Sequence, residues 1–171
     1  MQICVLVGNP KAGSRTLSAA EQVARRLAGP ADTVTTIDLA EHAGQLFAWP
    51  AAEVDALSAT AAGCDVLVVA SPTYKATYTG LLKAFLDRYQ AGDLRGVRAI
   101  PVMTGADKGH QMAPDTGLRP LLVELGASVP TSSIYIETPR LDALDEQLDA
   151  WLAHNGLEPG AALRPGTAVA R

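Results

Sequence analysis

A buried strand and a polar loop meet in Val66-Leu67-Val68-Val69-Ala70-Ser71-Pro72-Thr73-Tyr74-Lys75. The first five residues form a continuous apolar run, which is typical of a parallel strand covered on both faces. A proline and a Thr/Tyr-rich segment follow, and the helical pattern Leu81–Ala91 comes next. The polar loop therefore lies at the carboxyl edge of a sheet, where parallel-sheet proteins place their ligands.

The same alternation of apolar runs and helical patterns continues along the whole chain. The other predicted strands are Ile3–Val7, Val34–Leu39, Ala99–Met103 and Ser133–Ile136. The other predicted helices are Leu17–Leu27, Glu53–Ala62, Leu118–Gly126 and Leu141–His154. This alternation predicts an α/β doubly wound sandwich, with a parallel sheet and helices on both faces. The chain length favours the five-stranded, flavodoxin-like strand order 2-1-3-4-5.

Length and composition predict one compact domain. With 171 residues, 48% of them hydrophobic and 19% charged, the chain can bury a sizeable core and is not disordered. We expect the domain to occupy residues 1–155. Residues 156–171 are rich in Gly, Pro and Ala, and we expect them to form a flexible C-terminal tail or an arm that contacts another subunit.

Charge and hydropathy exclude several partners. The net charge is -4 without a basic run, which argues against a nucleic-acid partner. No apolar stretch approaches the roughly 18 residues needed to span a bilayer, and the start lacks a signal-peptide pattern, so we expect a cytoplasmic protein without a membrane partner. Cys4 and Cys64 lack CxxC spacing and clustered histidines, so no metal site is predicted.

A second polar loop, Gly8-Asn9-Pro10-Lys11-Ala12-Gly13-Ser14-Arg15-Thr16, links the first strand to the first helix. Such a loop presents backbone N–H groups and the positive end of a helix dipole to an anion. Ser14 and Thr16 add hydroxyl donors, and Lys11 and Arg15 add positive charge. The lysine of a Walker A loop and the GxGxxG pattern are both absent, so the loop favours a single terminal phosphate. The alternative is a plain turn that ends in a helix cap.

The predicted strand order makes the first and third strands neighbours, so both polar loops face one crevice. Pro72 to Lys75 would form a wall and supply backbone N–H groups to a flat ring. Thr104 and Gly105 follow the fourth strand, where Gly105 permits close approach of the backbone to a ligand. A phosphate at one end and a ring at the other predict flavin mononucleotide (FMN). A flavin supplies its own hydride chemistry, so no catalytic side chain is expected.

Three segments together resemble the NAD(P)H-dependent FMN reductase family. They are Gly8-Asn9-Pro10-Lys11…Ser14-Arg15-Thr16, Ser71-Pro72-Thr73-Tyr74-Lys75…Tyr78-Thr79-Gly80-Leu81-Leu82-Lys83, and Thr104-Gly105. The likeness extends from the first strand to about Pro139. It is strongest to the flavin reductases of alkanesulfonate utilisation, which supply reduced flavin to a separate monooxygenase. The resemblance implies a flavodoxin-like fold, FMN with NADPH or NADH, a partner monooxygenase, and a homodimer or homotetramer.

The resemblance also implies roles for single residues. Ser14, Arg15 and Thr16 would hold the FMN phosphate, while Asn9 and Lys11 occupy the places of the family's usual Ser and Arg. The ring would be lined by Pro72, Thr73, Tyr74 and Lys75 on one side and by Thr104 and Gly105 on the other. Lys75 could instead attract the phosphates of the nicotinamide cofactor, or face water.

Two alternative functions remain open. An FMN-containing quinone, azo or metal-oxyanion reductase would keep FMN as a fixed prosthetic group. A flavodoxin-like electron carrier would bind FMN without oxidising NAD(P)H, although such carriers are often more acidic than this chain.

Overall fold

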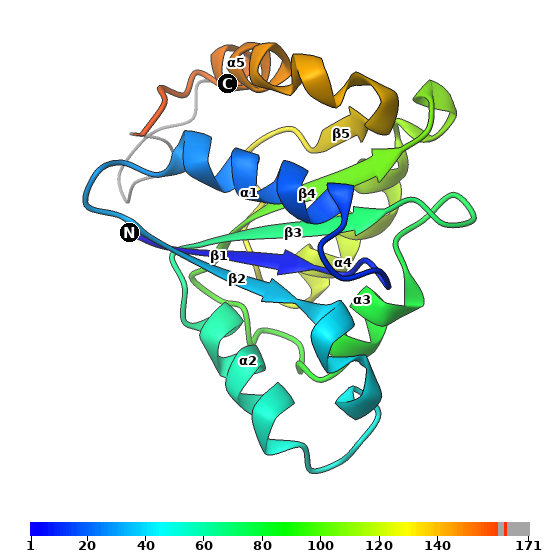
Figure 1. Ribbon diagram of the computed structural model, residues 1–171. Helices are drawn as coiled ribbons and strands as arrows, with labels where there is room; N and C mark the ends of the chain where they lie inside the picture. The colour runs from blue at the N-terminus through cyan, green and yellow to red at the C-terminus, as the bar shows by residue number, and fades with distance from the viewer. Residues whose placement is uncertain (161–162, 164–171) are drawn as a thin grey trace.

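The computed structural model describes residues 1–160 and 163, and this part of the chain contains one parallel sheet (Figure 1). Its strands are β1 (Gln2–Val7), β2 (Thr33–Asp38), β3 (Val66–Pro72), β4 (Arg98–Gly105) and β5 (Ile134–Glu137). They pair in the order β2-β1-β3-β4-β5. All four pairings are parallel. The predicted flavodoxin-like topology is therefore confirmed.

Helices cover both faces of the sheet (Figure 1). One layer contains α1 (Arg15–Leu27) and α5 (Leu144–His154). The opposite layer contains α2 (Ala52–Ala62), α3 (Gly80–Leu86) and α4 (Arg119–Glu124). Short 3-10 helices adjoin the sheet and the helices: η1 (Leu39–Gln45), η2 (Lys108–His110) and η4 (Thr138–Ala143).

Alternation along each strand builds two separate cores. In β1, Ile3, Val5 and Val7 pack toward α1 and α5, whereas Cys4 and Leu6 pack toward the layer of α2 to α4. β3 is buried at every residue, because it lies in the middle of the sheet and has helices on both faces. Such complete burial explains why its sequence is apolar without polar alternation.

β2 is less covered by helices than the central strands. It is an edge strand in the described sheet, and its first four residues, Thr33 to Thr36, are exposed. Val34 is 42% exposed. Threonine suits this position because it is β-branched and still tolerates water on an open strand.

Three helices differ from their predicted bounds by more than two residues or in helix type. α5 begins at Leu144 and not at Leu141, because the 3-10 helix η4 precedes it. α3 ends at Leu86 and not at Ala91; the Asp93 side chain accepts from the Gln90 N–H at 2.8 Å, and Gly92 has φ +93°. The predicted helix at 118–126 is preceded by a π-helix, η3 (Pro114–Leu118), in which the Arg119 N–H donates to the Pro114 carbonyl. Pro120 follows and has no N–H to contribute, so regular helical hydrogen bonding is interrupted here.

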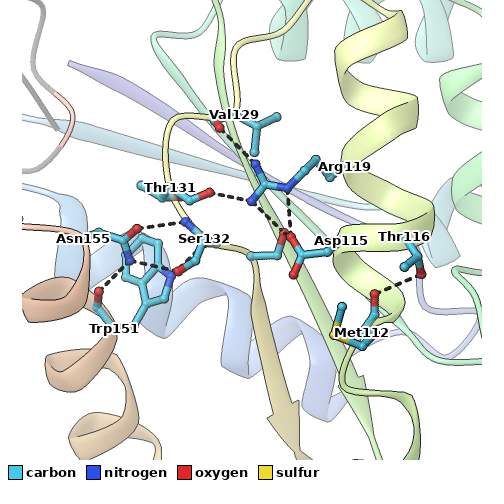
Figure 2. Close-up of polar contacts among 10 residues, drawn as sticks. Met112, Asp115, Thr116, Arg119, Val129, Thr131, Ser132, Trp151 and Asn155 are labelled. Atoms are coloured by element: carbon cyan, nitrogen blue, oxygen red, sulfur yellow. Dashed lines mark hydrogen bonds and ion pairs between the residues drawn. The ribbon is translucent and has the colours of Figure 1, made fainter. Parts of the chain in front are cut away.

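Two polar side chains hold the segment that leads into β5 (Figure 2). On one side, Arg119 donates to the carbonyls of Val129 at 3.1 Å and Thr131 at 2.6 Å. On the other side, Asn155 accepts from the Ser132 N–H at 2.8 Å and donates to the Ser132 hydroxyl at 3.0 Å and to the Trp151 carbonyl at 2.7 Å. The start of β5 is therefore tied to both helical layers.

The packed part of the chain continues beyond residue 155. Leu157 and Leu163 are buried in the core formed with α1 and α5. The Gly160 N–H donates to the Arg26 carbonyl at 3.0 Å. The remainder of the predicted tail, residues 161–162 and 164–171, lies outside the described residues. Across the described residues, no helix combines the length and apolar character that crossing a bilayer requires.

We predict that Asn155→Ala lowers the free energy of unfolding by about 2 kcal/mol, because the half-buried Ser132 N–H and hydroxyl lose their hydrogen bonds to this side chain. Urea denaturation measures the change. His154→Ala is the matched control, since His154 is exposed on the same turn and its loss should cost less than about 0.5 kcal/mol. An Asn155→Ala protein as stable as this control would contradict the role given to the Asn155 side chain.

Candidate functional site

A cavity of about 420 Å³ opens at the carboxyl edge of the sheet. Every site residue predicted from the sequence lines it except Lys75. The lining consists of Asn9, Lys11, Gly13, Ser14, Arg15, Thr16, Pro72, Thr73, Tyr74, Thr104, Gly105, Ala106 and Thr138. The β1–α1 loop thus meets the ends of β3, β4 and β5 around one volume, as the strand order requires.

Side chains of the β1–α1 loop hold the loop in shape. The side-chain oxygen Oδ1 of Asn9 accepts from the Lys11 N–H at 2.9 Å. The side-chain Nδ2 of Asn9 donates to the Thr16 hydroxyl at 3.1 Å. Ser14 has extended backbone angles and caps α1 by accepting from the Leu17 N–H at 3.2 Å. Asn9 therefore has a structural task here, in addition to any contact with a ligand.

Several hydrogen-bond donors lie where the β1–α1 loop runs into the start of α1. The backbone N–H groups of Ser14, Arg15 and Thr16 have no acceptor within residues 1–160 and 163. The Ser14 hydroxyl already accepts from Leu17, so its proton is free to donate. Lys11 and Arg15 are exposed at the rim and add positive charge. Backbone donors, a hydroxyl and cations at a helix N-terminus fit a phosphate group.

Two buried hydroxyls join this loop to the other side of the cavity. The hydroxyl oxygens of Thr16 and Thr104 lie 2.8 Å apart, and each residue is 2% exposed. One of their two protons makes the mutual hydrogen bond. The other has no acceptor in the described part of the chain, so it remains available to a ligand oxygen. The Thr104 carbonyl in turn accepts from the Thr73 N–H at 2.7 Å.

The segment after β3 forms a tight hairpin that projects beyond the end of the strand (Figure 1). Tyr74 and Thr77 exchange backbone hydrogen bonds of 2.8 and 3.2 Å, and Lys75 and Ala76 have φ of 52° and 68°. Two consecutive positive φ values identify a type I′ turn. Lys75 lies exposed at its tip and does not line the cavity, whereas Thr73 and Tyr74 do.

Gly105 is required by packing as well as by the ligand cavity. A Cβ atom at Gly105 would lie 1.8 Å from the phenol oxygen of Tyr135. That phenol crosses over Gly105 and donates to the Asp107 carbonyl at 2.7 Å. Partial burial raises the pKa of Tyr135, so the phenol keeps its proton and remains a donor at neutral pH. Sequence reasoning gave Gly105 only the ligand-facing role and missed Tyr135.

The side chains that line the cavity are mostly neutral and polar. Its lining contains no His, Cys, Asp or Glu. Within the described residues, no group of three or more such side chains is placed to hold a metal ion. The lining supplies hydroxyls, backbone donors and two cations, which suit a phosphorylated ligand that brings its own reactive group.

The family model described as NADPH-dependent FMN reductase matches residues 1–138. The chain belongs to the NADPH-dependent FMN reductase family. The sequence is 32% identical over 130 residues to an FMN reductase (NADPH) of Escherichia coli (strain K12), covering 74% of this chain and 68% of that relative. It is 36% identical over 78 residues to the NADH-dependent FMN reductase SfnF of Pseudomonas putida, covering 46% of this chain and 42% of that relative.

A solved structure extends the match to nearly the whole fold. The apo form of an NADH:FMN oxidoreductase (EMOB) superimposes with a TM-score of 0.78 at 30% identity, covering 96% of this chain and 97% of that structure. At the level of the family, these findings confirm the expected class, an FMN reductase that uses FMN with NADPH or NADH. The binding roles of individual residues stay predictions.

Three residues of this FMN reductase line the cavity without having been predicted: Gly13, Ala106 and Thr138. Gly13 and Ala106 lie beside predicted residues, so counting whole loops would have included them. Thr138 directly follows β5. It could have been predicted only from the rule that all strands of a parallel sheet end at the same edge. The resemblance covered this position but gave it no role.

We predict that Gly105→Ala destabilises this FMN reductase by about 2 kcal/mol, because a methyl group cannot share space with the Tyr135 phenol. Chemical denaturation of a double-mutant cycle with Tyr135→Ala measures the coupling. In the Tyr135→Ala background, Gly105→Ala should cost less than about 1 kcal/mol. An equal cost in both backgrounds would show that Tyr135 is not what excludes a side chain at Gly105.

Proposed function

We propose that this protein is an NAD(P)H:FMN oxidoreductase that binds FMN exchangeably and supplies reduced FMN to a flavin-dependent monooxygenase. The observation that carries the proposal is the cavity of about 420 Å³, in which a phosphate-type donor set meets the residues that follow β3 and β4 at the carboxyl edge of the sheet. Membership in the FMN reductase family supports the reaction class. The relative SfnF is an NADH-dependent FMN reductase, which supports flavin as the substrate.

The residues of the chain have binding and orienting roles in this proposal. Ser14, Arg15 and Thr16 hold the phosphate through the unpartnered N–H groups, the Ser14 hydroxyl and the guanidinium. Thr73 and Tyr74 form one wall of the ring site. Thr104 and Gly105 form the opposite wall. When FMN is bound, its ring supplies the hydride-accepting chemistry, so the chain needs no acid or base of its own.

Exchange of FMN is supported by the character of the cavity. Tyr74 is its one aromatic side chain, and it is 53% exposed. Large apolar contacts usually dominate tight cofactor retention. With few such contacts, most of the affinity rests on the phosphate end. The cytoplasmic location and the homodimer or homotetramer belong to the same proposal, and they rest on the sequence and on the family resemblance.

Anaerobic oxidation of NADPH and NADH by dialysed protein, measured across a range of added FMN, tests the proposal. We expect turnover that saturates in FMN and leaves reduced FMN in the filtrate. Turnover by retained FMN that requires an added quinone would replace the proposal with a prosthetic-group reductase. FMN that binds without being reduced by either nucleotide would replace it with an electron carrier.

We predict that Arg15→Ala raises the dissociation constant of FMN about fivefold, because an exposed cation contributes up to about 1 kcal/mol to an ion pair. The loss should shrink as salt is raised, since exposed charges are screened within about 10 Å at 0.1 M. Flavin fluorescence titration at two salt concentrations measures both effects.

Arg25→Ala is the matched control for this prediction. It removes the same charge from the other end of α1, where Arg25 pairs with Glu21 at 3.8 Å. We expect the control to bind FMN as the unaltered protein does. If Arg15→Ala and Arg25→Ala gave equal constants, Arg15 would not contact the phosphate.

A further inference from the structure

Asp38 stands directly behind the β1–α1 loop, at the end of β2. One of its carboxylate oxygens accepts from the Gly13 N–H at 3.1 Å, and the other accepts from the Ala40 N–H at 3.3 Å. Asp38 is 7% exposed and does not line the cavity. Its contact with Gly13 therefore reaches the loop from behind, away from the space a ligand would fill.

The charge of Asp38 makes this placement unexpected. Within residues 1–160 and 163, no cation forms an ion pair with this carboxylate, so two backbone N–H groups alone stabilise its charge. A buried anion near a phosphate site opposes binding through repulsion. Asp38 can therefore favour phosphate binding only if another effect outweighs this repulsion.

The compensating effect is the ordering of the Gly13 backbone. It has φ +60°, and no atom would lie within 4 Å of a Cβ at this position, so neither a side chain nor close packing restrains it. Ordering such a backbone residue costs conformational entropy. The hydrogen bond to Asp38 orders Gly13 before any ligand arrives. It also directs the Gly13 N–H away from the cavity, just before the three free N–H groups of Ser14 to Thr16.

We infer that Asp38 is a positioning residue that preorganises the phosphate loop and thereby sets the preference for FMN over unphosphorylated flavins. The inference rests on the proposed function, because it takes the loop as the phosphate site. Asp38 acts through Gly13 and touches no ligand atom. Preorganisation improves affinity by removing an ordering cost from the binding step. Riboflavin lacks the phosphate, so its affinity should not depend on the shape of this loop.

Titrations of FMN and of riboflavin, followed by flavin fluorescence, test this role in the full-length protein. We expect Asp38→Ala to raise the dissociation constant of FMN about tenfold, the scale of a lost charge-assisted hydrogen bond. Its dissociation constant for riboflavin should stay within about twofold. In steady-state assays with FMN as substrate, KM should rise while kcat at saturating FMN stays within about twofold.

Two further variants separate positioning from charge and from stability. Asp38→Asn keeps an oxygen that can accept from Gly13 and removes the negative charge, so it should bind FMN at least as tightly as the unaltered protein. Asp65→Ala removes a half-buried carboxylate that accepts from the Gln2 N–H at 2.7 Å at the opposite end of the sheet. This control should change neither flavin constant.

The outcomes distinguish this inference from the proposed function. If the unaltered protein binds FMN no more tightly than riboflavin, the phosphate site itself is wrong, and the inference fails with it. If the unaltered protein prefers FMN but Asp38→Ala keeps that preference, or weakens both flavins equally, only the role of Asp38 is overturned. A fall in melting temperature without a change in the FMN constant would likewise reduce Asp38 to a structural cap.

Discussion

The hydrogen bond between the Thr16 and Thr104 hydroxyls holds the two halves of the site together. The two residues are 88 positions apart in sequence, and they meet because β1, β3 and β4 are successive neighbours in the sheet. The Thr16 hydroxyl also accepts from the Asn9 side chain, which holds the β1–α1 loop in shape. The Thr104 carbonyl accepts from the Thr73 N–H at the start of the hairpin. A displacement at either end of this chain of contacts would therefore move the other. Each of the two hydroxyl-bearing residues is 2% exposed, and burial strengthens a hydrogen bond of this kind.

The packing beneath the loop makes the site rigid. Gly8, the first residue of the loop, accepts a hydrogen bond from the Thr79 hydroxyl through its carbonyl and donates to the Ala70 carbonyl at 2.8 Å. A Cβ at Gly8 would lie 2.3 Å from the Cβ of Leu82, so α3 packs directly against the backbone of the loop. Thr79 is also the N-cap of α3. One threonine thus connects the start of the phosphate loop to the helix that follows the ring loop, and the two ligand-facing loops share a single support.

Much of this arrangement could be predicted from the sequence, because the strands and most helices carry strong periodic patterns and the strand order brings both loops to one edge. Several contacts that the sequence did not predict join residues that are far apart along the chain. Nothing local indicates that Tyr135 crosses over Gly105 or that Asp38 reaches Gly13. The positive φ values of Lys75 and Ala76 turn Lys75 away from the cavity, although neither residue is a usual choice for a type I′ turn. The predicted strand order already placed β2 at the edge of the sheet, but it did not show how little the helices cover this strand, whose residues Thr33 to Thr36 are exposed.

The proposed site has a phosphate end and a ring end, and the two ends affect the release of reduced FMN differently. The phosphate end carries the free N–H groups, the hydroxyls and the cations, and the phosphate of FMN does not change when the ring is reduced. Contacts made there bind oxidised and reduced flavin equally, so they set affinity without favouring either form. In the proposed binding mode, discrimination between the two forms is left to Thr73, Tyr74 and Gly105, which line the cavity with backbone groups and one half-exposed aromatic ring. In the proposed binding mode the phosphate contacts hold both forms alike, so release of reduced FMN depends on the sparse contacts at the ring end.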